Sequence, residues 1–308
     1  MGLHLLSLID LPEHLVAPGG FDHAAYHPTM GWLYVAHTIN NTLDVIDCQT
    51  DAYLHSIPDL TGVAGALVSP ERDKIFTSNR GENTIGIFSS STEDELVKVP
   101  VGIRPNGLSF DPTRGHLLAA NVGDPSIPGS FTLSMVDVTS RKMVASIPAP
   151  GRTRWAVYDL QTDAFYVNIA DPAQIVVVDG NQADRVARVI NIPAFGPHGL
   201  DLDLKTGRLF CACDAKKLVT LDARSGQILS ELPLSGSPDV IFFNPTLHHL
   251  YAASGEPGLI DVFDTDEMRL METVQTEKGA HTIGFDPDRN KVYTFLPQTH
   301  RASVYEDS

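Results

Sequence analysis

The sequence predicts a single seven-bladed β-propeller over residues 1–308, in which each blade is a sheet of four antiparallel strands. Two observations carry this prediction. A unit of about 43 residues recurs seven times along the chain, and the N-terminal segment matches the one strand that the seventh unit lacks. A chain of 308 residues is long enough for two domains, but a repeat that runs from end to end indicates one.

The repeat is visible at three landmarks, which return at intervals of 41 to 48 residues. The first is a large side chain in a short strand: Tyr34, Phe76, Leu118, Tyr166, Phe210, Tyr251 and Tyr293. The second is an acidic or polar residue that ends a later strand: Asp47, Ser89, Asp137, Asp179, Asp222, Asp264 and Glu306. The third is a tight turn, for which Pro, Asp and Asn are suited: His27-Pro28, Ser69-Pro70, Asp111-Pro112, Asp159-Leu160, Asp203-Leu204, Asn244-Pro245 and Asp286-Pro287.

The segments between these landmarks are short and rich in Val, Ile, Leu, Tyr and Phe, as β-strands require. Each unit is therefore predicted to run strand A, turn, strand B, loop, strand C, turn, strand D. No segment shows a convincing helical period. Four strands at this spacing are typical of a propeller blade.

The seventh unit supplies only three strands, which are expected at Ala280–Phe285, Lys291–Leu296 and Ala302–Tyr305. The fourth strand of the earlier units ends in an aliphatic-Pro pair: Ile57-Pro58, Val99-Pro100, Ile147-Pro148, Ile192-Pro193 and Leu232-Pro233. The sixth unit departs from this pattern, whereas the N-terminal segment follows it with Leu11-Pro12. We therefore expect residues 5–11 to complete the last blade and close the ring, which leaves no unpaired blade edge.

The composition excludes some classes of partner. The chain has 22 Lys and Arg against 38 Asp and Glu, a net charge of −16, which repels nucleic acids and anionic membranes. The same charge also serves solubility. No apolar run is long enough to span a membrane, and the first residues lack the features of a signal peptide, so we expect a cytoplasmic protein, or a secreted one whose leader has been removed. The three cysteines form no disulfide framework and are expected to be buried thiols: Cys48, Cys211 and Cys213.

A candidate site lies where the A strands begin, because this position recurs seven times around one mouth of the central channel. Its residues are Asp22, Ala64, Asn106, Arg154, His198, Asp239 and His281. Four of them, His198, Asp239, His281 and Asp22, come from consecutive blades and form a ligand set for a divalent metal. Zn, Mn or Fe suits this set best, and Ca or Mg less well. The alternative is a solvated ring of polar groups around a water-filled channel.

Asn106 and Arg154 are expected on the opposite side of this mouth, where they would bind an anionic part of a substrate. An Arg side chain favours planar, bidentate pairing with a carboxylate or phosphate. Alternatively, Arg154 neutralises Asp22 or Asp239 across the ring. The neighbouring Trp155 is expected to belong to the core between blades.

The loops between strands B and C add further polar residues on the same face: His37, Asn79, Arg80, Asn121, Asp214, Glu256 and His300. The longest of these loops, residues 121–130, is rich in Gly and Pro and would shape one side of a pocket. His37 and His300 are candidate general bases, since imidazole titrates near neutral pH. Either one is otherwise an ordinary surface histidine.

The units resemble YVTN-type propeller repeats, on the strand sequences Leu33-Tyr34-Val35-Ala36-His37, Ile75-Phe76-Thr77-Ser78-Asn79 and Leu118-Ala119-Ala120-Asn121. Arg104-Pro105-Asn106-Gly107-Leu108 is similar to the metal-binding segment of gluconolactonase-type propellers, whose other ligands have no clear match here. Gly196-Pro197-His198-Gly199-Leu200 resembles a segment of virginiamycin B lyase, in which such histidines serve a metal-assisted elimination; the Trp-Phe-Thr-Glu motif of that family is absent. These resemblances imply a propeller fold and are compatible with a lactonase or a lyase.

The sequence thus favours a metal-dependent enzyme that acts on a small anionic or lactone-like ligand, as a lactone or ester hydrolase or as a lyase. The metal would polarise a carbonyl group, Arg154 would hold an anionic group, and His37 or His300 would transfer a proton. Two alternatives are a non-catalytic scaffold that binds a protein or peptide on this face, and a metal-binding protein without turnover.

Overall fold

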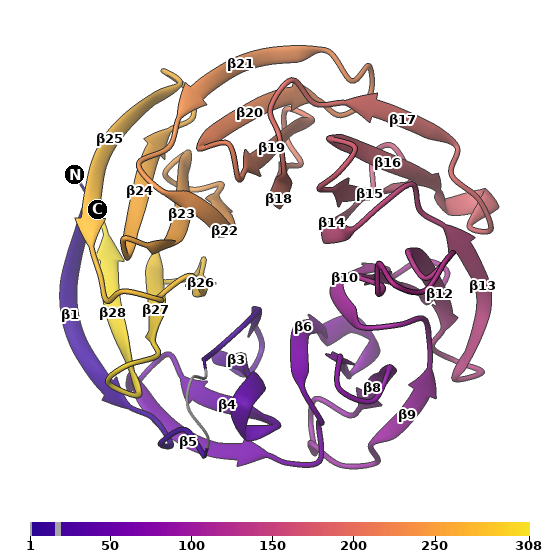
Figure 1. Cartoon of the computed structure of the whole chain (residues 1–308). Helices are drawn as coiled ribbons and strands as arrows, with labels where there is room; N and C mark the ends of the chain where they lie inside the picture. Colours follow the sequence, from indigo (N-terminus) through magenta and orange to yellow (C-terminus); the bar gives the residue numbers. More distant parts are fainter. Residues whose placement is uncertain (1, 16–19) are drawn as a thin grey trace.

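The computed structural model describes residues 2–15 and 20–308, and it forms a closed ring of seven blades (Figure 1). Each blade is a four-stranded antiparallel sheet. The innermost strands, which line the channel, are β2 (Ala24–His27), β6 (Val63–Ser69), β10 (Pro105–Asp111), β14 (Thr153–Asp159), β18 (Pro197–Asp203), β22 (Ser237–Asn244) and β26 (Ile283–Asp286). The second strands are β3 (Trp32–His37), β7 (Lys74–Asn79), β11 (His116–Asn121), β15 (Ala164–Ile169), β19 (Arg208–Cys213), β23 (His249–Glu256) and β27 (Lys291–Leu296).

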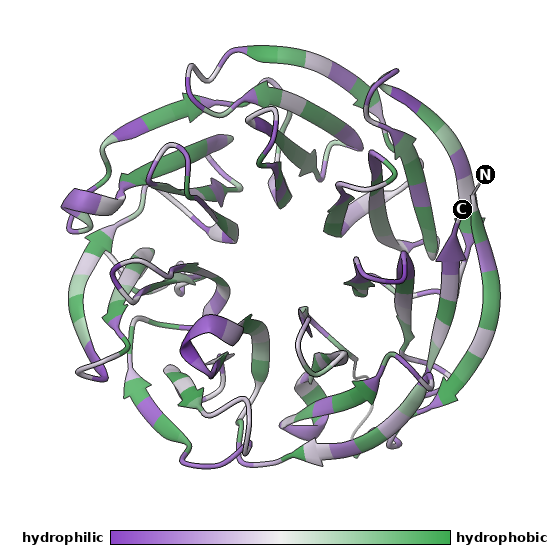
Figure 2. Cartoon of the chain, turned by 180° about the vertical axis from the view of Figure 1, so that it is seen from behind, coloured by the Kyte–Doolittle hydropathy of each residue, from purple (hydrophilic) through white to green (hydrophobic). Residues whose placement is uncertain are grey.

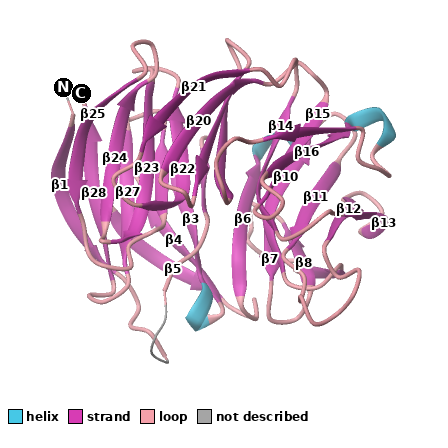
Figure 3. Cartoon of the chain, turned by 45° about the horizontal axis from the view of Figure 1, so that its top comes forward, coloured by secondary structure: helices cyan, strands magenta, loops and turns pink. Residues whose placement is uncertain are grey.

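The outer half of each blade completes the predicted pattern. The third strands are β4 (Thr42–Asp47), β8 (Thr84–Phe88), β12 (Thr132–Asp137), β16 (Gln174–Asp179), β20 (Lys217–Asp222), β24 (Leu259–Asp264) and β28 (Arg301–Asp307). The outermost strands are β5 (Ala52–Ile57), β9 (Val97–Pro100), β13 (Lys142–Pro148), β17 (Arg188–Asn191), β21 (Ile228–Pro233), β25 (Arg269–Gln275) and β1 (Leu3–Asp10). The helical segments of the described residues are three short 3-10 turns (Figure 3): η1 (Thr38–Asn40), η2 (Pro70–Arg72) and η3 (Gly180–Gln182).

The N-terminal strand closes the ring as the sequence predicts. β1 pairs antiparallel with β28, from Leu3 opposite Asp307 to Asp10 opposite Arg301, so the two ends of the chain lie side by side on the last blade (Figure 1). The strand begins and ends slightly earlier than the expected residues 5–11. It buries Leu3 and Ile9, which join the apolar clusters of the last blade and its neighbours.

The large side chain of each second strand joins one blade to the next. All seven side chains are at most 1% exposed to solvent. The four tyrosines among them also donate a hydrogen bond to the following blade: Tyr34 to Glu93 at 2.9 Å, Tyr166 to the carbonyl of Ala223 at 3.0 Å, Tyr251 to Asp307 at 2.7 Å, and Tyr293 to Asp51 at 2.7 Å. This landmark therefore recurs because each blade needs an anchor in its neighbour.

The acidic and polar landmarks close the turns within each blade. The Oδ1 atom of Asp111 accepts the backbone N–H groups of Thr113 and Arg114, and that of Asp264 accepts those of Asp266 and Glu267. Such a side chain satisfies the turn's otherwise unpaired donors. The repeated Asp and Asn residues are thus explained by local backbone geometry, without a functional role.

The apolar core lies between adjacent blades, and hydrophobic segments alternate with hydrophilic ones on the outermost strands (Figure 2). Cys48, Cys211 and Cys213 are buried free thiols, as expected, and the sulfurs of the last two lie 3.8 Å apart. Within the residues that the structure describes, no helix is long and apolar enough to cross a membrane.

Candidate functional site at the channel mouth

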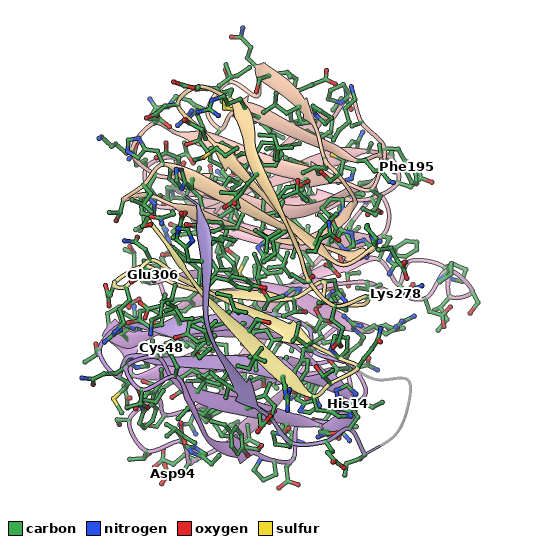
Figure 4. The ribbon with its side chains drawn as sticks, turned by 90° about the vertical axis from the view of Figure 1, so that its left-hand side faces the viewer. His14, Cys48, Asp94, Phe195, Lys278 and Glu306 are labelled. Atoms are coloured by element: carbon green, nitrogen blue, oxygen red, sulfur yellow. The ribbon has the colours of Figure 1, made fainter. Side chains whose placement is uncertain are left out.

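The connections that lead into the A strands all lie on one face of the ring, which we call the mouth face. Figure 4 shows His14, Phe195 and Lys278, which precede three different A strands, on the same side of the molecule. Cys48, Asp94 and Glu306, from the turns between outer strands and the end of β28, lie on the opposite side. Residues at the starts of the A strands therefore face one common rim.

A histidine held between two carboxylates dominates this rim. Nδ1 of His198 lies 2.8 Å from Oδ1 of Asp214, and Nε2 of His198 lies 3.0 Å from Oδ1 of Asp239. The three side chains are 15–25% exposed. Burial opposes protonation of the ring, but the two carboxylates outweigh it and raise the pKa of His198 to about 9. His198 is therefore an imidazolium at neutral pH, with both N–H groups committed to the aspartates.

Asp239 is correspondingly held as a carboxylate. Burial alone would raise its pKa, yet the charge and hydrogen bond of His198, together with His281 and His23, lower that pKa well below its usual range. Nε2 of His281 lies 3.7 Å from Oδ2 of Asp239, too far for a hydrogen bond. Nδ1 of His281 donates to the carbonyl of Gly279 at 2.8 Å, so Nε2 is the ring nitrogen left without a hydrogen bond among the described residues.

Arg154 lies against this group as a second cation. Its Nη1 atom is 3.0 Å from Nε2 of His198, and its Nη2 atom is 3.6 Å from Oδ2 of Asp214. Nε2 of His198 cannot donate to Asp239 and accept from Arg154 at once, so the protonated ring and the guanidinium stand as neighbouring positive charges. The Nε atom of Arg154 is buried and has no hydrogen-bond partner within the part of the chain that the structure describes. An anion placed between these groups would relieve their repulsion.

Three more arginines extend the positive charge from Arg154. The pKa of Arg152 is lowered by partial burial and by the positive charges of Arg154, Arg104 and Arg80, so all three guanidinium groups act on it. Arg80 is paired with Asp22 at 3.0 Å. Among the described residues, no carboxylate lies within 4.0 Å of the charged nitrogens of Arg104 or Arg152. We call Arg80, Arg104, Arg152 and Arg154 the arginine rim.

Sequence reasoning did not single out Arg104 and Arg152 as site residues. Each stands two residues before a residue that it did single out, Asn106 and Arg154 respectively. This two-residue spacing could have identified both arginines, because the loop that precedes an A strand lies at the same mouth of the channel as the start of the strand. Gly107 helps to bring the rim together, since a Cβ atom there would lie 2.4 Å from the carbonyl oxygen of Arg154.

Asp22 does not contact the His198–Asp239 pair directly. Its carboxylate lies 3.3 Å from Nε2 of His23 and 3.0 Å from Arg80. The sequence left open that Arg154 neutralises Asp22 or Asp239. In the structure an arginine does neutralise Asp22, but this arginine is Arg80. Asn106 is 9% exposed, and its Oδ1 atom is buried without a partner, close to the arginine rim.

Trp155 packs against the apolar cluster between blades 4 and 5, as sequence reasoning expected, and it also reaches into the channel. Its ring centroid is 3.9 Å from that of His23, although the two residues come from blades 4 and 1, which are not neighbours. It also meets Phe242 of blade 6 edge-on at 6.4 Å. These contacts cross the channel, so Trp155 and His23 form a plug beneath the mouth.

His37 and His300 gather away from the His198–Asp239 pair, around His14 of the N-terminal loop. Their ring centroids lie 5.0 and 4.3 Å from that of His14. His37 is completely buried and bonded to Asp44 at 2.7 Å. Burial and the two other imidazoles lower the pKa of His14 to about 4. Among the described residues, no contact joins this cluster to the His198–Asp239 pair.

The remaining polar residues of the B–C loops divide into structural and rim positions. Asn79 and Asn121 are fully buried and donate to hydroxyl groups of their own blades, for example from Asn121 to Ser134 at 2.9 Å. Glu256 is exposed and paired with Lys278 at 3.2 Å. Asp214 and Arg80 are the two that reach the mouth.

The donor set does not fit a metal ion in this arrangement. Among residues 2–15 and 20–308, no three His, Cys, Asp or Glu side chains are placed to hold one together. The two ring nitrogens of His198 lie 2.8 Å from Asp214 and 3.0 Å from Asp239, so a metal would have to displace a proton from one of them before it could bind. A Zn, Mn or Fe site at His198, Asp239, His281 and Asp22 stays a prediction from the sequence, and no chemical step below depends on it.

The metal prediction has its own test. Elemental analysis of protein purified without chelators, followed by titration with Zn or Mn between pH 8 and pH 5, would reveal a site. Imidazole ligation requires an affinity that falls as the pH falls, because a protonated ring cannot bind metal. An absence of bound metal, or an affinity that is flat over this range, would contradict the prediction.

The ion pair at the mouth predicts how stability depends on pH. The pKa of His198 is about 9 in the folded protein and about 6.5 in the unfolded chain. Its protonation therefore stabilises the fold fully below about pH 6.5, and this contribution to the free energy of unfolding is lost as the pH rises through 9. Asp239 has the opposite pH dependence, because its pKa is lowered in the folded protein. Its carboxylate stabilises the fold above about pH 4, and this contribution to the free energy of unfolding is lost as the pH falls below that value. His198→Gln is therefore expected to lower Tm by several degrees at pH 6 and by much less at pH 9.5. Thermal melts at both values check this, and an unchanged difference would contradict it.

Comparisons with known proteins support the propeller fold and reveal a weak similarity to 6-phosphogluconolactonases. No protein-family model matches the chain. A 6-phosphogluconolactonase of Erwinia tasmaniensis is 26% identical over 111 residues, 32% of this chain and 34% of that protein. A 6-phosphogluconolactonase of Bacillus subtilis is 28% identical over 131 residues, 37% of this chain and 38% of that protein. The matches thus span about a third of these relatives.

Among solved structures, a chain of Kuenenia stuttgartiensis hydrazine synthase superposes with a TM-score of 0.83 over 95% of this chain and 97% of that one, at 13% identity. At so low an identity the likeness shows the fold alone. Together with the seven four-stranded sheets, this likeness establishes a seven-bladed β-propeller. Its sequence has weak, partial similarity to lactone hydrolases.

Proposed function

We propose that this protein is a lactone hydrolase that opens a sugar lactone bearing an anionic group, at the channel mouth. The observation that carries the proposal is the division of charge at this mouth. The arginine rim comes from blades 2 to 4 and the loops that join them, and it meets the chain of His198, Asp239 and His281 from blades 5 to 7 where Arg154 lies 3.0 Å from His198. The partial similarity to two 6-phosphogluconolactonases supports a phosphorylated sugar lactone as the substrate class.

The arginine rim would bind the anionic group. Arg104 and Arg152 have no carboxylate partner among the described residues, and the buried Nε atom of Arg154 lacks a hydrogen bond. Guanidinium groups bind phosphate oxygens in a bidentate way. In a protein of net charge −16, such a cluster is stabilised by an anion more than by solvent.

The chain of His198, Asp239 and His281 would carry out the hydrolysis. Water attacks the lactone carbonyl carbon and gives its proton to Nε2 of His281, the nitrogen left free by the bond to Gly279. The developing negative charge on the carbonyl oxygen is stabilised by Arg154 and by the imidazolium of His198. The ring C–O bond then breaks, the leaving oxygen takes the proton from His281, and the product acid loses its own proton to solvent.

Replacement of His281 tests this assignment against the one made from the sequence. His281→Gln is expected to lower kcat by about 10²–10⁴ with little change in KM, because it removes proton transfer and leaves the arginine rim intact. His300→Gln, at a histidine of the separate cluster, is the matched control and is expected to retain activity. The opposite result, with His300 essential and His281 dispensable, would overturn the proposal.

A second candidate is a surface that binds a protein, because the mouth face also presents apolar side chains. Phe195 is 63% exposed and Ile127 is 47% exposed, both on loops of this face. Under this alternative, Phe195→Ser would abolish binding of a partner while Arg154→Ala would not, and no lactone would be hydrolysed.

A further inference from the structure

We infer that the channel beneath the plug is a second binding site, which takes a small organic cation with an apolar body. A cavity of about 430 Å³ begins at His23 and Trp155 and runs to the turns that end the A strands. The rim residues at the starts of those strands, such as Arg154 and Asp239, do not line it. The cavity therefore opens on the face opposite the mouth.

The walls of this cavity are aromatic. Five aromatic side chains line it: Tyr26, Phe110, Trp155, Tyr158 and Phe242. They come from blades 1, 3, 4 and 6 and so surround the space from several directions. Aromatic faces attract ammonium groups and also remove the apolar part of a ligand from water. The volume is within the range of small-molecule sites.

The charged groups of the walls favour a ligand that carries a positive charge. Asp201 and Glu71 line the cavity, and no Lys or Arg among the described residues does. His23 adds no positive charge, because burial lowers its pKa below the ordinary value, against the opposing effect of Asp22 and Asp239. A phosphorylated lactone is repelled by such walls, whereas a cation is favoured.

Asp201 is the expected partner of the cation. Its oxygens accept the backbone N–H groups of Leu202 at 2.8 Å and Phe243 at 2.6 Å, which fix the carboxylate in place. Among the described residues, no basic group lies within 4.0 Å of it. An ammonium group would satisfy the lone pairs that these two hydrogen bonds leave open.

Ser109 supplies an independent indication of a ligand. Its side chain lines the same cavity, is 3% exposed, and has an Oγ atom without any hydrogen-bond partner in the described residues. A buried hydroxyl without a partner is uncommon and costs stability unless something bonds to it. A ligand with both an ammonium and an apolar ring would reach Ser109 and Asp201 from the space between them.

Titration with three probes of similar shape tests the inference: phenethylammonium, the neutral phenethyl alcohol and the anionic phenylpropionate. Binding is followed calorimetrically with the full chain, and the change in its tryptophan fluorescence is compared with that of a Trp32→Phe variant, in which Trp155 is the remaining tryptophan. We expect phenethylammonium to bind with a Kd below about 1 mM, the alcohol at least ten-fold more weakly, and the anion not at all. Equal binding of all three probes, or no binding of phenethylammonium up to about 10 mM, would overturn the inference.

Variants place the binding in this cavity. Asp201→Asn keeps the shape and is expected to weaken binding of phenethylammonium at least ten-fold, whereas Asp184→Asn, at a carboxylate 67% exposed on the outer surface, should not change it. Should Asp201→Asn fail to fold, Phe242→Leu reports on the aromatic wall and is expected to weaken binding several-fold. Unchanged binding in whichever of these two variants folds would overturn the inference. Hydrolysis at the mouth plays no part in these measurements.

Discussion

Removal of residues 1–12 is expected to unfold this protein or to lower its Tm by more than about 10 °C. The deletion takes away β1, exposes the whole edge of β28, and leaves the clusters that contain Leu3 and Ile9 open to water. Loss of two or three buried aliphatic side chains alone costs several kcal/mol, against a typical total stability of about 5–15 kcal/mol. Thermal melting and size-exclusion chromatography of the truncated chain measure the effect.

A matched pair of variants separates closure of the ring from simple loss of apolar residues. Leu3→Ala with Ile9→Ala removes side chains that are 8% and 4% exposed, whereas Leu6→Ala with Leu8→Ala removes side chains that are about half exposed. The first pair should be clearly destabilising and the second nearly neutral. A truncated protein that melts within a few degrees of the intact chain would contradict the closure.

Arg154→Ala is expected to reduce kcat/KM for a phosphorylated sugar lactone by about 10²–10³, the largest effect that we expect from a single side chain of the arginine rim. The residue both faces the anion and lies beside the imidazolium of His198. Arg154→Lys keeps the charge but loses the planar fork, so about a ten-fold loss is expected. Steady-state kinetics of the three proteins provide the comparison.

Arg185→Ala is the control for a general loss of positive charge, because this arginine is 63% exposed on the outer surface and its ion pair with Asp184 is long at 3.7 Å. It should leave kcat/KM unchanged. Variants at position 154 that fold normally and match the parent would show that Arg154 serves only as a counter-ion of Asp214.

The ring was predictable because its determinants are local and repeated. A tight turn and a large buried side chain in the second strand recur once per blade, so each position reinforces the others, and the aliphatic-Pro pair identified the closing strand. The same periodicity located the rim residues at the starts of the A strands, including His198, Asp239 and His281.

What the sequence could not show is how far each side chain reaches across the channel. Trp155 touches a residue three blades away, a contact that no spacing within a unit reveals. Asp214 was assigned to a B–C loop without a partner, although it lies 2.8 Å from His198 and, together with Asp239, raises the pKa of that ring. His37 and His300 share the mouth face with the proposed site but turn toward His14.

The most direct test of the account is the rate at which the purified protein hydrolyses 6-phosphogluconolactone compared with unphosphorylated gluconolactone, each corrected for spontaneous opening. The divided charge of the mouth predicts hydrolysis of the phosphorylated lactone well above the spontaneous rate, with kcat/KM at least about 10²-fold higher than for the neutral one. Hydrolysis of both compounds at the spontaneous rate would contradict a lactonase, and equal acceleration of the two would contradict the role of the arginine rim.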